Sequence, residues 1–238
     1  DIISHKLDSE ILLSKVLQTK REKILINLDK IIEKTKILEF NQLIQRRSNK
    51  EPIAYILNEK EFWSKPFMIS RSTLVPRPET ELMVEKLVNL FVGKNLSILD
   101  IGTGSGCILI SLISELKKSK GIGIDVSKKA IEIAIKNASK FTVDNRIRFF
   151  RASINNFNQK KFDLIVSNPP YIRSVDIKNL DDDIKKYEPK IALDGGNDGL
   201  DLIKKVIYKS KYILKINGLL AIEIGTVSYT HLTLPTKA

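Results

Sequence analysis

Five stretches of this sequence predict β-strands that are apolar on both faces, and this feature restricts the fold more than any other. The stretches are LSILDIG, GIGIDV, RIRFF, FDLIVSNPP and GLLAIEIG, and helical periodicity separates them near residues 106–117, 127–139 and 199–214. Strands of this kind are buried on both faces, which is typical of parallel sheets covered by helices. Strands that alternate with helices also need right-handed crossovers. The sequence therefore predicts an α/β fold with a doubly wound, Rossmann-like sheet.

The first part of the chain has a different pattern. Apolar residues follow helical spacing through residues 8–50, and Pro52 is expected to end the last of these helices because proline has no N–H to continue it. KEFWSKPFMIS then predicts a β-hairpin, and PETELMVEKLVNLFV predicts a helix with Pro78 in its first turn. We therefore expect an N-terminal helical domain over 1–58, a hairpin linker over 59–77 and a larger domain over 78–226.

The last twelve residues, 227–238, differ in character from the rest of the chain. VSYTHLTLPTKA is rich in threonine, poor in charge and follows the predicted strand GLLAIEIG without turn residues. It resembles a translated sequencing adapter, so we expect a non-native tail and exclude it from the fold argument.

The composition limits which cellular compartment and which kinds of partner are expected for this chain. The chain has 238 residues, of which 42% are hydrophobic, and a single cysteine, Cys107, which excludes an internal disulfide and favours the cytoplasm. No apolar run is long enough to span a bilayer, so we expect no membrane partner. The formal net charge of +12 would suit a phosphate-rich partner. The lysines are scattered rather than clustered, however, which favours a solvated surface.

A glycine loop follows the first predicted strand and runs into a helix near Cys107. Glycines allow a tight turn and a close ligand, while the helix N–H groups point at the ligand's polar end. At the tip of the second strand, Asp125 can accept hydrogen bonds from both ribose hydroxyls of an adenosine ligand. The G-x-G-x-G spacing after an acid resembles motif I of class I methyltransferases, although a dehydrogenase remains possible on these residues alone. The candidate cofactor residues are Gly102, Thr103, Gly104, Ser105, Gly106 and Asp125.

The fourth predicted strand delivers Asn168-Pro169-Pro170-Tyr171 to its carboxyl end, where open α/β sheets bind ligands. The Asn168 side-chain oxygen and the Pro169 carbonyl can each accept one N–H bond from a planar NH2 group, which orients its lone pair toward a methyl donor. The prolines have no N–H and stiffen the backbone, and Tyr171 can stack on a flat group. These residues are therefore the catalytic and substrate-binding candidates. Adenine N6, guanine N2 and a glutamine amide all suit this chemistry.

Three further stretches, EPIAYILNEKEFW, TLVPRPETE and YEPKIALDGGNDGLD, bracket both motifs. Together they resemble the HemK/PrmC family, the release factor glutamine N(5)-methyltransferases, from Leu7 to Gly225. The resemblance implies a class I methyltransferase domain behind a helical domain that recognises the substrate. It also implies that S-adenosylmethionine methylates the glutamine of a release factor's Gly-Gly-Gln loop and leaves S-adenosylhomocysteine. We expect a monomer whose catalysis needs neither nucleic acid nor metal.

By the same resemblance, Asn168 also contacts the cofactor, and Arg77 of the PRPET segment orders the substrate pocket. The sister family, which acts on a ribosomal protein, shares NPPY, but the uninterrupted PRPET favours the release factor enzyme. Two departures stand out. Ser153 and Ile154 occupy positions where the family often has an acid and a bulky aromatic, so Ile154 is expected to pack on adenine. The family sheet also normally ends in a further strand pair that we expect to be missing here.

Two matters stay open on the sequence. Glu223, in the fifth predicted strand, is expected either to face the substrate or to pair with a lysine, with equal weight. The chain is also compatible with a protein that binds a factor or cofactor without turnover, or with a nucleic-acid amino-methyltransferase.

Overall fold

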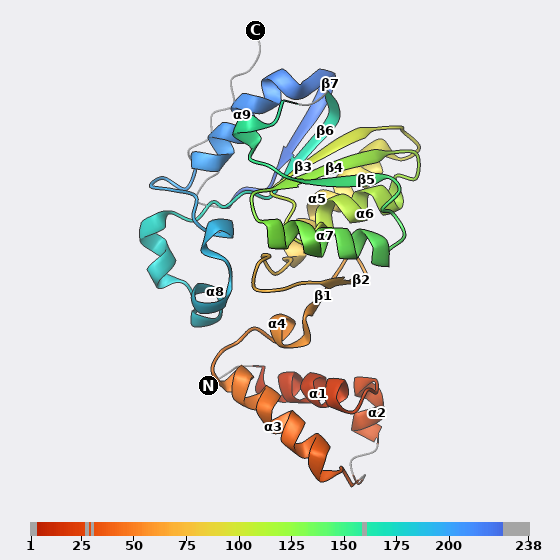
Figure 1. The fold of residues 1–238 in the computed structure, drawn as a ribbon, viewed down its shortest axis with the longest axis vertical. Coiled ribbons are helices and arrows are strands. Elements are labelled where there is room, and N and C mark those ends of the chain that lie inside the picture. Colours follow the sequence, from red (N-terminus) through yellow and green to blue (C-terminus); the bar gives the residue numbers. More distant parts are fainter. Residues whose placement is uncertain (1–3, 27–28, 30, 159–160, 226–238) are drawn as a thin grey trace.

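The structure is a computed structural model that describes residues 4–26, 29, 31–158 and 161–225 (Figure 1). The predicted tail at 227–238 lies outside the described residues. Among the described residues, no helix has the length and apolar character needed to cross a membrane.

The predicted parallel sheet forms the centre of the larger domain. Its strand order is β5-β4-β3-β6-β7, and every neighbouring pair is parallel. From β3 the chain first adds β4 and β5 on one side and then adds β6 and β7 on the other. The carboxyl ends of β3, β4 and β6 therefore lie together at one edge, which is where such sheets bind ligands. The strands are β3 (Ser97–Ile101), β4 (Lys120–Asp125), β5 (Ile147–Arg151), β6 (Phe162–Ser167) and β7 (Leu214–Ile222).

Helices cover both faces of this sheet. Successive residues of β3 show why: Ile98 packs with the helices α5, α6 and α7, and Leu99 packs with α9 and the 3-10 helix η1 on the opposite face. Because side chains alternate along a strand, an apolar pair at consecutive positions needs cover on both sides. The helices are α5 (Pro78–Phe91), α6 (Cys107–Glu115), α7 (Lys128–Lys140), α9 (Asp201–Ile213) and η1 (Ile154–Asn156).

The fifth strand begins earlier than the sequence predicts. The glycine at 218 was expected to open the strand after a helix over 199–214, but α9 ends at Ile213 and β7 begins at Leu214, opposite Phe162. The pairing then shifts register between Phe162 and Leu164, and Asn217 has a φ of 63°. An irregular stretch inside a strand of this kind is a β-bulge, which local periodicity does not reveal.

The N-terminal region is helical, and one expected boundary is wrong. Its last long helix ends at Ser48, so Pro52 does not terminate it; Pro52 instead caps the short helix that follows. Proline suits a helix start because its missing N–H is not needed there. The predicted hairpin is present, with Glu61 opposite Pro66. The elements are α1 (His5–Val16), α2 (Arg21–Ile26), α3 (Lys34–Ser48), α4 (Ile53–Leu57), β1 (Glu59–Phe62) and β2 (Lys65–Met68).

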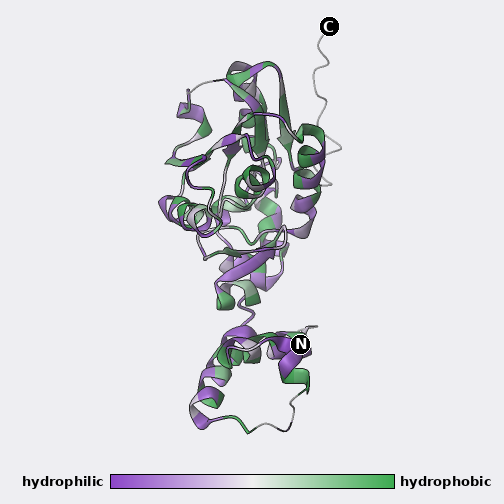
Figure 2. Ribbon diagram, turned by 90° about the vertical axis from the view of Figure 1, so that its right-hand side faces the viewer, coloured by the Kyte–Doolittle hydropathy of each residue, from purple (hydrophilic) through white to green (hydrophobic). Residues whose placement is uncertain are grey.

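The remaining elements lie between β6 and α9. They are η2 (Ser174–Asn179), α8 (Asp182–Tyr187) and η3 (Lys190–Ala192). In both Figure 1 and Figure 2, helices α1 to α3 lie at one end of the molecule and the sheet at the other, joined through α4 and the hairpin.

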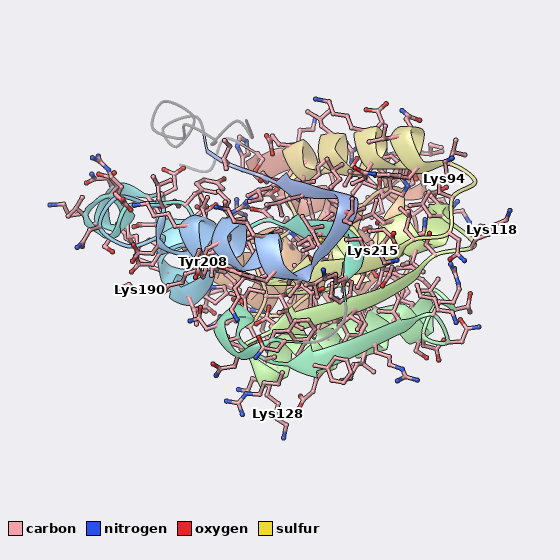
Figure 3. The ribbon with its side chains drawn as sticks, turned by 90° about the horizontal axis from the view of Figure 1, so that it is seen from above. Lys94, Lys118, Lys128, Lys190, Tyr208 and Lys215 are labelled. Carbon is pink, nitrogen blue, oxygen red and sulfur yellow. The ribbon has the colours of Figure 1, made fainter. Side chains whose placement is uncertain are left out.

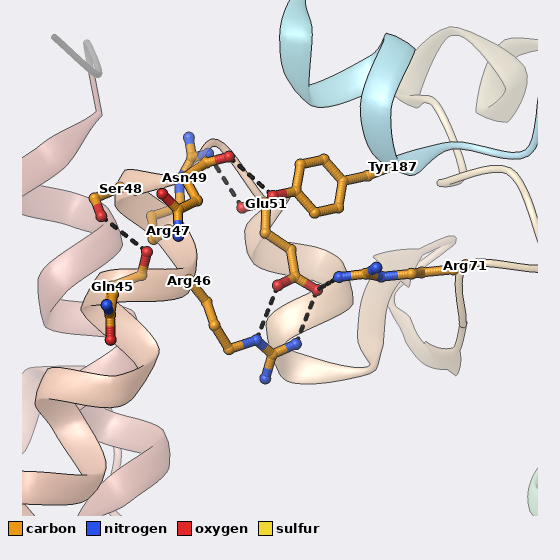
Figure 4. A network of polar contacts seen from close by, with 8 residues as sticks. All are labelled: Gln45, Arg46, Arg47, Ser48, Asn49, Glu51, Arg71 and Tyr187. Atoms are coloured by element: carbon orange, nitrogen blue, oxygen red, sulfur yellow. Dashed lines mark hydrogen bonds and ion pairs between the residues drawn. The ribbon is translucent and has the colours of Figure 1, made fainter.

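A buried carboxylate joins the two parts (Figure 4). Glu51, only 4% exposed, accepts two hydrogen bonds of 2.9 Å from Arg46 on α3 and one of 2.9 Å from Arg71 beyond the hairpin. The Arg71 guanidinium lies over the Tyr187 ring, and the Tyr187 hydroxyl donates to the Asn49 carbonyl. These arginines hold the pKa of Glu51 at about 2. The contacts fix α3 against the larger domain.

Replacing Glu51 by alanine is expected to loosen this attachment. Arg46 and Arg71 would lose their shared acceptor, but both are partly exposed and can be solvated, so the free energy of unfolding should fall by about 2 kcal/mol. Limited proteolysis should then cleave between α3 and β1 faster than in the unchanged protein. The control is Glu39→Ala, which removes an exposed pair with Lys36. Equal cleavage rates for the two variants would contradict the expectation.

Positive charge is spread around the larger domain. Figure 3 shows Lys190 at the left of the molecule, Lys128 at the bottom, and Lys94 and Lys118 at the right. They come from separate segments of the chain. A phosphate-rich partner would favour a single basic face, and these four lysines do not form one.

Candidate active site

The glycine loop adopts a conformation that depends on its glycines. Gly102, Gly104 and Gly106 have φ values of 74°, 56° and 81°, in the region that disfavours side chains. A Cβ on Gly106 would lie 3.3 Å from the Ala134 Cβ on α7, so this glycine allows the start of α6 to lie close to α7. A Cβ on Gly102 would meet no heavy atom within 4 Å. The first glycine thus borders open space, and the third closes the turn.

Asp125 lies at the carboxyl end of β4 beside this loop. Its Oδ2 accepts from the Gly104 N–H at 3.0 Å, and its Oδ1 accepts from the Ser127 N–H at 2.8 Å. Burial raises the pKa of Asp125. Each oxygen has a second lone pair, so the carboxylate can accept further hydrogen bonds from a ligand.

The acid before the loop is buried completely. Asp100 accepts a hydrogen bond of 2.7 Å from the Thr103 hydroxyl, and its Oδ1 has no partner among the described residues. Burial raises its pKa to about 7, with a further contribution from Asp125. A cationic ligand in the adjacent pocket would favour the ionised carboxyl group.

The Asn-Pro-Pro-Tyr segment follows β6. The Ser167 hydroxyl donates to the Ile101 carbonyl at 2.8 Å, which ties the end of β6 to the end of β3. The next residue, Asn168, donates from Nδ2 to the Thr80 Oγ1 at 3.2 Å. Tyr171 packs under Gly225, where a Cβ would lie 2.7 Å from its ring, and burial raises the pKa of Tyr171. The segment is therefore held from α5 and from the end of β7.

One pocket brings the glycine loop and this segment together. Its lining includes Gly102, Asp125 and Asn168, and a second pocket with Tyr171 in its wall shares Asn168, Pro169 and Pro170 with it. Of the sequence candidates, the first pocket is lined by Gly102, Thr103, Gly104, Ser105, Asp125, Ser153, Ile154, Asn168, Pro169, Pro170 and Arg77. Gly106 is not in its wall, and Tyr171 lines the second pocket alone.

Arg77 lines both pockets and is held by a buried acid. Its guanidinium donates to the Glu188 Oε1 at 2.6 Å, and the Val75 N–H donates to the other oxygen at 3.4 Å. Burial raises the pKa of Glu188, and the Arg77 charge opposes that shift. Glu188 therefore anchors the segment before α5 against the segment that follows α8.

The sequence did not single out Thr80 or Glu188 as functional residues. Both lie in the stretches that carry the family resemblance, PRPET and YEPK, and that placement was the available signal. Glu223 lies beside the site: Thr80 and Asn168 stabilise its charged form by hydrogen bonding. Among the described residues Glu223 forms no ion pair with a lysine, and it lines neither pocket, so the expectation that it faces the substrate stays a prediction.

Among the described residues, the other reactive side chains that the sequence raises have structural roles. Burial raises the pKa of Cys107 to about 12, which disfavours the thiolate and a nucleophilic role. Asp182 and Asp183 lie in the first turn of α8, where acids stabilise a helix start. In the described part of the chain, no group of three or more His, Cys, Asp or Glu side chains is placed to hold a metal ion.

Two family models match the chain. The one described as a PrmC N-terminal domain matches residues 1–57, and the one described as a methyltransferase domain matches residues 93–224. The second covers more than half of the sequence and includes both the glycine loop and the Asn-Pro-Pro-Tyr segment.

Named relatives agree with this match. The release factor glutamine methyltransferase of Buchnera aphidicola subsp. Baizongia pistaciae is 43% identical over 93% of this chain and 80% of its own length. That of Geobacter sulfurreducens is 36% identical over 92% of this chain and 77% of its length. A bifunctional methyltransferase of Rickettsia typhi is 37% identical over 92% of this chain, which spans 46% of that protein. The identity and coverage of the first two show that this chain belongs to the release factor glutamine methyltransferase family.

Proposed function

We propose that this chain transfers a methyl group from S-adenosylmethionine to the side-chain amide nitrogen of a glutamine in a peptide chain release factor. The observation that carries the proposal is the Asn168 amide, whose Nδ2 is bound by Thr80 while the residue lines the pocket shared with the glycine loop. With its donor group occupied, the amide has its oxygen left to accept an N–H from a substrate.

The residues of the pocket at the glycine loop fit the cofactor. The open space at Gly102 admits a ligand close to the backbone, and Asp125 supplies free lone pairs for the ribose hydroxyls. Ile154, 3% exposed and in the pocket wall, offers an apolar surface for the adenine. When bound, S-adenosylmethionine supplies an electrophilic methyl group. We assign Gly102 to Gly106, Asp125, Ile154 and Asn168 to its binding.

The segment after β6 orients the nucleophile. An amide nitrogen is a weak nucleophile because its lone pair is delocalised into the carbonyl, so catalysis must come from positioning and electrostatics. The Asn168 Oδ1 and the Pro169 carbonyl accept the two N–H bonds of the substrate NH2 group. Pro170 has no N–H, so its backbone offers no donor that would compete for these acceptors. Tyr171 packs on the flat amide, and Arg77 orders the wall of the substrate pocket.

The family points to the substrate. The Buchnera and Geobacter relatives, of which this chain covers 80% and 77%, are named as release factor glutamine methyltransferases, and residues 1–57 match the domain described for that family. The proposal therefore includes recognition of a release factor by residues 1–58, attached through the hairpin at 59–77 to the catalytic part at 78–226. The proposal also includes a monomer whose catalysis needs no nucleic acid.

A competition assay tests the proposal. Labelled S-adenosylmethionine is offered to the protein together with a release factor and total RNA, and the label is followed into each. We expect label in the release factor at its Gly-Gly-Gln glutamine, and a release factor with that glutamine replaced by alanine should stay unlabelled. Label in RNA alone, or cofactor binding without any transfer, would overturn the proposed function.

Replacing Gly102 by alanine is expected to weaken cofactor binding about tenfold or more, because the new methyl group would project into the open space of the pocket and the positive φ would be strained. Isothermal titration with S-adenosylmethionine measures the change. The matched control is Gly93→Ala, with a φ of 75° and no heavy atom within 4 Å of its Cβ, but outside both pockets. Alanine at position 93 would therefore have a similar backbone strain, but its methyl group would not meet the cofactor. Equal affinity loss in the two variants would contradict the placement of the cofactor.

A further inference from the structure

Glu223 reaches the active site through the backbone pairing of the sheet. Its N–H donates to the Ser167 carbonyl at 3.0 Å, and Ile222 pairs with Ser167 in the parallel register of β6 and β7. Ser167 immediately precedes Asn168. The residue that follows β7 is therefore set beside the residue that follows β6, although the two are far apart in the sequence.

The Glu223 side chain is half-buried, and no described residue forms an ion pair with it. Its Oε2 is shielded from solvent and has no hydrogen-bond partner among the described residues. Burial raises the pKa of Glu223, while Thr80 and Asn168 lower it by hydrogen bonding. The charged groups that also act on it are Arg77, which lowers its pKa, and Glu79, which raises it. Shielding a carboxylate oxygen from water without a hydrogen-bond donor is costly, so its retention here calls for a role.

Thr80 connects this carboxylate to the catalytic amide. Its Oγ1 accepts the Asn168 Nδ2 hydrogen at 3.2 Å, and the residue is 2% exposed, so its own hydroxyl proton needs an acceptor within the protein. Both Thr80 and Asn168 lower the pKa of Glu223, as donors to a carboxylate do. The Asn168 NH2 group therefore lies within hydrogen-bond distance of Thr80, and the Glu223 carboxylate lies beside both residues.

We propose that Glu223 and Thr80 are positioning residues that lock the Asn168 amide with its oxygen toward the substrate. This inference rests on the proposed function, in which that oxygen accepts a substrate N–H. Without the carboxylate, the Thr80 hydroxyl is free to donate to the Asn168 oxygen. The Asn168 side-chain amide would then flip and present its NH2 group to the NH2 group of the substrate. Two donors cannot form a hydrogen bond with each other.

The lock requires an ionised Glu223. A protonated carboxyl group would donate a hydrogen bond itself and compete with Thr80, so the locked orientation is lost as the pH falls through the Glu223 pKa. The methyl-transfer rate should accordingly decrease on the acid side. Tyr171, whose pKa is raised partly by Glu223, titrates on the alkaline side and does not produce this limb.

Three variants test the lock by single-turnover methyl transfer. Thr80→Val removes the hydroxyl at constant shape and should slow transfer about tenfold or more, with S-adenosylmethionine affinity unchanged within about twofold. Thr80→Ser should restore most of the rate. Glu223→Gln, which does not titrate, should lose the acid limb of the pH–rate profile. Glu85→Gln on the exposed side of α5 makes the same chemical change away from the site and should behave as the unchanged protein.

A second measurement does not depend on turnover. The side-chain amide resonances of Asn168, identified by their absence in Asn168→Ala, should shift with pH in the unchanged protein and not in Glu223→Gln. A normal rate in Thr80→Val, or an acid limb and a pH-dependent shift that persist in Glu223→Gln, would overturn the inference. Should the unchanged protein show the shift but label no release factor, the proposed function would fail while the lock stands.

Discussion

Asn168→Ala is expected to lower methyl transfer about a thousandfold, the scale seen when a preorganised hydrogen-bonding group is removed from a reaction centre. The variant loses the acceptor that orients the substrate nitrogen, and alanine offers nothing in its place. Cofactor affinity should change much less, because Gly102 to Gly106 and Asp125 remain. Single-turnover transfer to a release factor and calorimetric titration with S-adenosylmethionine separate the two effects.

The control for this variant is Asn89→Ala, the same change on an exposed position of α5. It should leave both transfer and cofactor affinity as they are. Near-normal turnover in Asn168→Ala would disprove the mechanism. Loss of cofactor affinity in parallel with turnover would instead assign Asn168 to binding of the donor alone.

The second large effect is expected at Glu188. Its side chain is 2% exposed and pairs with Arg77, so Glu188→Ala would leave a guanidinium in the pocket wall without its acceptor. Breaking a buried pair from one side costs about 3 kcal/mol, of which part is recovered here because the Arg77 side chain is 32% exposed. Urea unfolding at pH 7 measures this loss.

A double-mutant cycle separates the pair from its surroundings. The double variant Arg77→Ala with Glu188→Ala should lose less free energy of unfolding than the sum of the two single variants. Both charged groups are then removed, so neither is left without its partner. Glu132→Ala, which removes an exposed partner of Lys128 at 4.0 Å, should cost little. Additive effects at Arg77 and Glu188 would show that the buried contact does not stabilise the pocket wall.

Most of the sheet and its helices could be predicted because they depend on local periodicity. The four strands from β3 to β6 and the helices α5, α6 and α7 lie within a residue or two of the expected ranges. The errors arose where pairing partners decide the boundary. Gly218 suggested a strand start, but Phe162 pairs with Leu214 and the strand continues through a bulge. Pro52 was read as the end of a helix, although proline is equally suited to begin one.

The glycine loop, Asp125 and the Asn-Pro-Pro-Tyr segment could be picked out as candidates without a structure, because each follows a predicted strand directly and parallel strands end at a common edge. The side chains that hold them became visible in the folded chain. Asn168 meets Thr80 across 88 residues, and Arg77 meets Glu188 across 111. The place of Glu223 beside Asn168 was likewise open until β7 was paired with β6. Periodicity reports which face of an element is buried, whereas contacts between distant segments follow from strand order, register and packing, which no local pattern contains.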